Sequence, residues 1–238
     1  EKPSVLGQAP LKGAVSLAVK GQYAFVAAGS RGMVILDTLD PTAPVVFDET
    51  PSAGALDLGV KDNFVLLADQ SALRIIRIYL FGTSFRISGI PLAGTPAGIT
   101  LAGSRAYVSA RAGGVHILDI SLPAEVGTGG LLRTLPAENA EASVVWKGRL
   151  LVADGDAGVK MFTEPYDMDP QVIDLPGYAA DMALSGSLLY TALGKGGLGV
   201  TDLAPLEAGG RSVRLETLPL ADVRAVCAEG CLLYTSPS

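Results

Sequence analysis

The 238-residue chain is poor in the residues that build metal centres and reactive sites. It has one histidine, His116, and two cysteines, Cys227 and Cys231. A single imidazole excludes centres that need two, and one cysteine pair cannot form a disulfide framework or a four-cysteine zinc site. On the strand alternation His116 faces away from Val115 and Ile117, so we predict a partly buried strand residue rather than a catalytic base.

Long apolar runs and blocks of like charge are also missing. The apolar segments are much shorter than the roughly 18 residues that cross a bilayer, so we expect no membrane insertion within this segment. The net charge of −6 comes from scattered acidic residues, which disfavours nucleic acid as a partner. Aromatic residues make up 6% of the chain and hydrophobic residues 49%, a composition suited to sheets that are covered on both faces.

Internal repetition is what the chain has in abundance. A tight turn recurs at positions 21, 62, 103, 148, 186 and 230, a spacing of about 40 residues that is typical of propeller blades. In the first copy the turn joins strands at 14–19 and 23–27, a Gly-containing loop leads to a strand at 33–36, and a fourth strand follows at 45–48. Large apolar residues alternate with small or polar ones, which indicates strands. Since no copy can bury both faces alone, we predict an all-β chain forming a β-propeller of four-stranded antiparallel blades.

The repeats run from end to end, which predicts a single domain over residues 1–230. The chain starts in the outer part of a repeat and stops after a second strand, so we predict five nearly complete repeats with a partial blade at each end, and six blades if these ends close together. Residues 231–238 also match the translation of a common sequencing adapter, and we interpret them as a non-native tail. A genuine strand is the alternative, because residues 186–191 fit the same position.

Three strand exits carry a family resemblance. Residues 32–44 (GMVILDTLDPTAP), 114–123 (GVHILDISLP) and 197–205 (GLGVTDLAP) are similar to the LVIVD repeat, a propeller-forming repeat of bacterial and archaeal proteins that are often exported or attached to the cell surface. Two copies depart from the pattern, with Arg77 and Thr163 where Asp is expected. The resemblance implies six or seven blades, a binding or scaffold role and an extracytoplasmic location. It implies no catalytic residues.

Several motifs have a structural interpretation that we prefer to a functional one. The recurring Asp37, Asp119 and Asp202 lie in different blades, and each is expected to cap the following turn by accepting backbone N–H groups. The segment 154–158 lacks the later oxygen ligands of a calcium loop, and the segment 194–197 opens no helix that could cradle a phosphate. We therefore predict ordinary turns there, and core or interblade packing for Trp146.

The candidate binding residues follow from the usual arrangement of a propeller, in which the loops between second and third strands share a rim with the starts of the inner strands. Functional residues concentrate on such loops. We predict a mixed-charge binding face to which Asp57, Asp69, Arg111, Asp154, Asp156 and Asp181 contribute, with Glu138, Asn139, Glu141 and Tyr178 in neighbouring loops. The alternative is that the loop residues are solvated and that the inner-strand acids cap backbone groups.

We predict a non-catalytic binding or scaffold module without cofactor, which recognises a protein, peptide or glycan through these loops. One alternative is a propeller hydrolase or lyase with a divalent metal on carboxylates at the channel mouth, for which Asp57, Asp181 and Asp154 are the obvious contributors. A second is a purely structural spacer in a larger surface protein.

Overall fold

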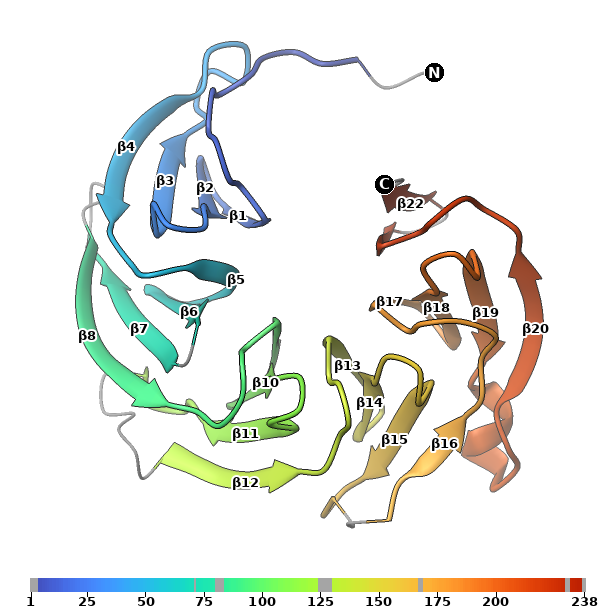
Figure 1. Cartoon of the computed structure of the whole chain (residues 1–238). Helices are drawn as coiled ribbons and strands as arrows, with labels where there is room; N and C mark the ends of the chain where they lie inside the picture. The colour runs from blue at the N-terminus through green and yellow to red at the C-terminus, as the bar shows by residue number, and fades with distance from the viewer. Residues whose placement is uncertain are drawn as a thin grey trace. The chain divides into compact units, whose positions relative to one another are not determined.

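The computed structural model describes residues 4–70, 72–79, 84–123, 130–166, 169–229 and 232–236. It contains five four-stranded antiparallel sheets and one two-stranded sheet, and in each the strand order follows the chain order (Figure 1). This arrangement confirms the predicted all-β chain of four-stranded propeller blades. In the part of the chain that is described, no helix has the length and apolarity needed to span a membrane.

The strands are these. The first sheet has β1 (Ser16–Lys20), β2 (Tyr23–Ala27), β3 (Met33–Asp37) and β4 (Val45–Thr50). The second has β5 (Ala55–Lys61), β6 (Phe64–Asp69), β7 (Ala72–Ile78) and β8 (Ser84–Pro91). The third has β9 (Gly98–Ala102), β10 (Arg105–Ser109), β11 (Val115–Asp119) and β12 (Leu131–Leu135).

The fourth sheet has β13 (Ala142–Trp146), β14 (Arg149–Ala153), β15 (Val159–Thr163) and β16 (Gln171–Ile173). The fifth has β17 (Asp181–Ser185), β18 (Leu188–Ala192), β19 (Leu198–Asp202) and β20 (Val213–Leu218), with the short 3-10 helix η3 (Ala204–Ala208) before β20. The last sheet pairs β21 (Ala225–Glu229) with β22 (Leu232–Ser236). Most of the proposed tail thus lies in β22, whereas Cys231, Pro237 and Ser238 are outside the described residues.

The chain divides into two compact units. The first unit comprises residues 1–106 and 118–132, and the second comprises residues 107–117 and 133–238. The division falls within the third sheet. Each unit is described below by itself.

In four sheets a glycine precedes the third strand and is fixed by the fourth strand of the same sheet. All four of these glycines have left-handed backbones, with φ between 77° and 89°. A Cβ at any of them would overlap a backbone carbonyl oxygen at the end of the fourth strand, so any other residue type would force that strand to shift. The four pairs are Gly32 with Thr50, Gly114 with Leu135, Gly158 with Ile173, and Gly197 with Leu218.

Apolar side chains of neighbouring sheets form the core of each unit. In the first unit, Phe25 and Ile35 of the first sheet pack with Leu58 and Leu67 of the second. The other face of the first sheet contacts Ala9 and Leu11, which precede β1. In the second unit, the core joins the fourth and fifth sheets through Trp146, Leu151, Met161, Met182 and Leu189. Trp146 is 4% exposed, and its Nε1 donates to the carbonyl oxygen of Gly186 in the next sheet at 3.1 Å, which confirms the predicted packing role.

The same hydrogen bond recurs with lysine in the first unit. The Nζ atoms of Lys20 and Lys61 donate to the turn carbonyls of Asp62 and Gly103, each in the next sheet. Lysine and tryptophan at the end of an inner strand are therefore equivalent links between successive blades.

Candidate functional site

Four of the loops between second and third strands make a two-way backbone link to the next blade. Gly29 and Ala55 exchange hydrogen bonds of 3.1 and 2.8 Å in the first unit. In the second unit the same exchange joins Arg111 with Ala140, Gly155 with Ala179, and Gly194 with Val223. The loop residue in all four links has a left-handed backbone, with φ between 47° and 58°.

Arg111 is the exception among these four loop residues, because the other three are glycines. A residue with a Cβ in this conformation costs about 1–2 kcal/mol, yet Arg111 adopts it with φ 47°. Its side chain is 53% exposed, so the core does not require it. Backbone strain at an exposed loop is a recognised feature of functional positions.

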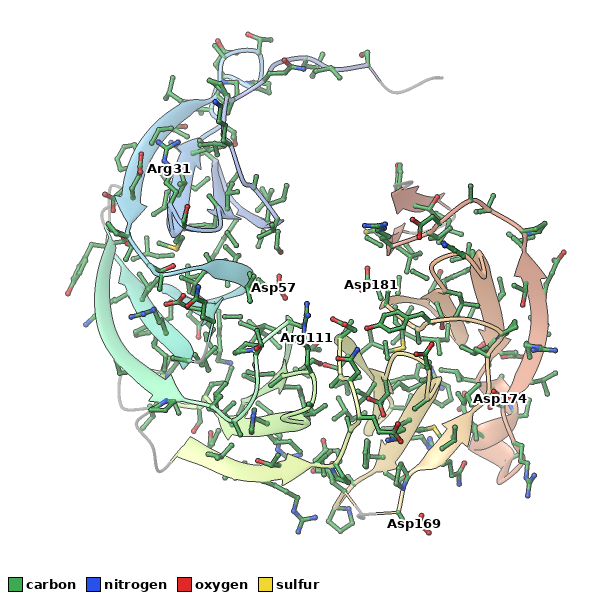
Figure 2. All side chains as sticks on the ribbon, viewed as in Figure 1. Arg31, Asp57, Arg111, Asp169, Asp174 and Asp181 are labelled. Carbon is green, nitrogen blue, oxygen red and sulfur yellow. The ribbon has the colours of Figure 1, made fainter. Side chains whose placement is uncertain are left out.

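Arg111, labelled in Figure 2, belongs to a group of polar side chains that we call the loop patch. Contacts join Arg111, Glu141, Tyr178 and Asn139, and the fifth member, Asp156, acts on Tyr178 through its charge. Arg111 Nε lies 3.6 Å from Glu141 Oε2, and Glu141 Oε1 accepts the Tyr178 hydroxyl at 2.5 Å. Asn139 Nδ2 donates to the same hydroxyl at 2.5 Å. All five residues belong to the second unit, and the patch offers both donors and acceptors.

Burial and neighbouring carboxylates shape the electrostatics of the patch. Desolvation raises the pKa of Tyr178 to about 12, and the hydrogen bond to Glu141 acts in the same direction. The Tyr178 hydroxyl therefore stays protonated at physiological pH and remains a donor. Its ring lies over Gly155, where a Cβ would come within 3.0 Å of the ring. Glycine at that position thus admits the aromatic side chain.

Two of the predicted site residues, Asp69 and Asp154, are buried and engaged within their own blades. Asp69 is 2% exposed and Asp154 is fully buried. Asp69 accepts the Gly54 backbone N–H at 2.8 Å and pairs with Arg74. Asp154 accepts the Asn139 N–H at 2.6 Å, and its other oxygen lies 2.6 Å from Lys160 Nζ. These carboxylates hold the loop before the first strand, so neither is one of the solvated loop residues that the alternative expects, and their burial disfavours direct ligand contact.

Asp57 and Asp181 also link inner strands (Figure 2). On β5 of the first unit, Asp57 accepts the Ser16 hydroxyl at 2.5 Å and the Ile99 N–H at 2.7 Å. Burial raises its pKa above the ordinary value of 3.8. On β17 of the second unit, Asp181 accepts the Val226 N–H at 2.9 Å. Both acids are half-buried and cap the inner strand of the next sheet.

The other motifs behave as the structural interpretation predicts. The carboxylates of Asp37, Asp119 and Asp202 each accept the backbone N–H two residues later, at 2.8–2.9 Å. His116 is 2% exposed, and its Nδ1 lies 2.9 Å from Thr134 Oγ1. Residues 154–158 and 193–197 are hydrogen-bonded turns. Within the described ranges, no three His, Cys, Asp or Glu side chains are grouped so as to hold a metal ion.

The sequence pattern placed Glu141, Asn139 and Tyr178 in loops on the same face as Arg111 but predicted no contact among their side chains. A signal was present, because aligning the repeats puts Arg111 where three others have glycine. Among the predicted residues, Arg111 and Asp156 both act on Tyr178 through their charges, whereas Asp69 and Asp154 are engaged elsewhere.

The LVIVD repeat model matches residues 13–49, 93–130 and 176–204. These are the three copies singled out by the sequence pattern, and the two copies with Arg77 and Thr163 lie outside the matched ranges. No curated protein matches the chain.

Solved structures share the fold at low identity. One is a protein from Bacteroides uniformis provisionally assigned as a 6-phosphogluconolactonase, 15% identical, with a TM-score of 0.82 over 97% of this chain and 80% of the other. A similarly assigned protein from Bacteroides fragilis is 13% identical, with a TM-score of 0.80 over 98% of this chain and 79% of the other. A computationally designed protein is 16% identical, with a TM-score of 0.67 over 93% and 67%. The chain is therefore built from β-propeller blades, three of which carry the LVIVD repeat.

Proposed function

We propose that this chain is a non-catalytic binding module, which recognises a protein, peptide or glycan through the loop patch and acts in an exported or cell-surface protein. The location rests on the LVIVD resemblance alone. We also propose that Asp57, in the first unit, and Asp181, in the second, contact the bound protein, peptide or glycan.

The strained Arg111 carries this proposal. Glycine would make the same link to Ala140 without strain, as it does in three other blades. Arginine supplies instead an exposed fork of donors beside a carboxylate and a tyrosine, a combination that hydrogen-bonds polar ligands. Since backbone strain persists where the surrounding structure or the function sustains it, the side chain is a reasonable candidate for ligand contact.

The test replaces Arg111 by glycine. Removing the left-handed strain (about 1–2 kcal/mol) offsets the added flexibility of glycine (about 0.5–1 kcal/mol), so the free energy of unfolding should change by no more than about 1.5 kcal/mol. Binding to glycan and peptide arrays should be lost. Arg211→Gly, at an exposed arginine outside the patch, is the matched control and should keep every captured ligand.

Two results would contradict the proposal. If R111G and Glu141→Gln both retain all ligands of the unmodified chain, the patch is not the binding site. If the folded chain captures nothing from either array, the spacer alternative is favoured.

A further inference from the structure

A second candidate site lies in the first unit, between the first two sheets. A pocket of about 880 Å³ is found there, next to the turns at residues 20–22 and 62–63. Tyr23, Ile78 and Tyr79 contribute aromatic and aliphatic surface, while Lys20, Asp62 and Arg77 contribute charge. This volume falls within the range of about 300–1,000 Å³ that is usual for small-molecule sites.

Arg77 is one of the two residues that depart from the LVIVD pattern. Arg77 pairs with Phe64 across the second sheet just as Asp37 pairs with Tyr23 across the first. Asp37 caps its own turn by accepting the Leu39 N–H. Arginine cannot accept that hydrogen bond, so Arg77 does not cap its turn. Its cationic side chain lines the pocket instead.

The guanidinium of Arg77 lacks an anionic partner among the described residues. Its Cζ lies 5.8 Å from the Phe64 ring centroid and 5.3 Å from that of Tyr79, so two aromatic faces hold it in place. Its Nε is buried and has no hydrogen-bond acceptor in the described part of the chain. By contrast, Arg74 on the same strand is paired with Asp69. A buried donor without an acceptor is costly, so the fold gains no stability from this hydrogen-bonding group, in contrast to that of Arg74.

The charges around the pocket select the sign of the ligand. Lys20 and Arg77 are cationic and Asp62 is the one carboxylate among the lining residues, which leaves an excess of one positive charge. A cationic ligand would be repelled. A free phosphate would lose its hydration against a largely apolar lining. A ligand with an apolar part and one carboxylate fits better. Its apolar part would pack against the pocket lining, and its carboxylate would pair with the guanidinium, which binds carboxylates in a bidentate fashion.

We propose that this pocket binds an aromatic carboxylate, with the ring against Tyr23, Ile78 and Tyr79 and the carboxylate on Arg77. The ligand is either a free aromatic acid or the C-terminal aromatic residue of a peptide, which presents the same chemistry. This site is independent of the loop patch, because its residues belong to the first unit and those of the patch to the second.

The experiment is calorimetric titration of the full chain with 2-naphthoate. Saturable binding is expected, and the uncharged 2-naphthalenemethanol should bind at least about tenfold more weakly, the loss expected for a charge-assisted hydrogen bond. Arg77→Met keeps an apolar stem and should weaken naphthoate binding to the same extent. Arg224→Met, at an exposed arginine that does not line the pocket, is the matched control and should leave binding unchanged.

A second variant separates loss of binding from loss of folding. Arg77→Asp restores the residue found in the LVIVD copies, so a native thermal transition is expected together with loss of naphthoate binding. Peptides ending in Phe, with a free or an amidated carboxyl terminus, distinguish the two sources. Tighter binding of the free-acid peptide than of naphthoate identifies a peptide terminus, and the reverse identifies a small acid. Absence of saturable binding of both acids, or equal naphthoate binding by wild type and R77M, overturns the proposal.

Discussion

At the residue scale, two glycines of one loop in the fifth sheet meet different structural constraints. Gly194 has φ 55°, and a Cβ there would meet its nearest neighbour, Asp222 Oδ1, at 3.8 Å. Gly197 has φ 86°, and a Cβ there would overlap the Leu218 carbonyl oxygen. The first position carries only a conformational constraint, whereas the second also carries a steric one.

We therefore expect Gly194→Ala to lower the free energy of unfolding by about 1–2 kcal/mol. Gly197→Ala should cost about 1–3 kcal/mol more, because the fourth strand must move to make room. Urea denaturation of the two variants and the unmodified chain measures both values. Equal losses for the two variants would show that the overlap at Gly197 is relieved without cost.

At the scale of elements, one carboxylate joins three inner strands in the first unit. Asp57 on β5 accepts from Ser16 on β1 and from Ile99 at the start of β9. Asp57→Ala leaves the Ile99 N–H without its acceptor and should cost about 1–3 kcal/mol. Asp57→Asn should cost less, since its Oδ1 can accept from Ile99 while its Nδ2 donates to the Ser16 hydroxyl oxygen.

Burial raises the pKa of Asp57 against the effect of its hydrogen bonds, so the stability of the fold depends on pH through this group. The folded protein binds the proton more tightly than the unfolded chain, whose pKa is near 3.8. The stabilisation from protonation is present below that value and is lost as pH rises through the folded pKa. We therefore compare the free energies of unfolding of wild type and D57N. Their difference (wild type minus D57N) should fall between pH 3.8 and the folded pKa of Asp57, and it should stay constant at higher pH. Urea titrations at successive pH values test this, and parallel curves for both proteins would refute it.

At the scale of the whole molecule, apolar side chains on inner and central strands are covered to very different degrees. Leu189 on β18 is completely buried in the core of the second unit, whereas Leu17 on β1 of the first unit is 65% exposed. Leu189→Ala should cost about 2–5 kcal/mol because it leaves a cavity. Leu17→Ala should change the free energy of unfolding by no more than about 0.5 kcal/mol. Chemical denaturation compares them, and a large loss for L17A would indicate that β1 is covered in solution.

The repeats made much of the fold predictable. The second, third and fourth strands expected in the first copy, at 23–27, 33–36 and 45–48, all lie within observed strands. The turn-capping role of Asp37, Asp119 and Asp202 was also correct, because such a cap depends only on residues two positions apart. Local geometry is encoded locally, so period and spacing suffice to predict it.

The candidate sites were less predictable, because they depend on residues about 40 positions apart in neighbouring blades. Asp154 accepts backbone N–H groups and pairs with Lys160, whereas Asp156 is exposed. Nothing in the composition of the loop distinguishes these two residues. The departure at Arg77 was visible in the repeat pattern, but the pocket beside it was not.

The sequence by itself determined the blades, their order and the three LVIVD copies, since alternation and a regular repeat specify strands and hairpins over short distances. Only the tertiary structure decided which charged side chains are buried as caps, which remain exposed, and which cation faces a pocket. Those outcomes depend on how one sheet stacks on the next, and a shift of a few ångströms in that stacking makes or breaks a hydrogen bond.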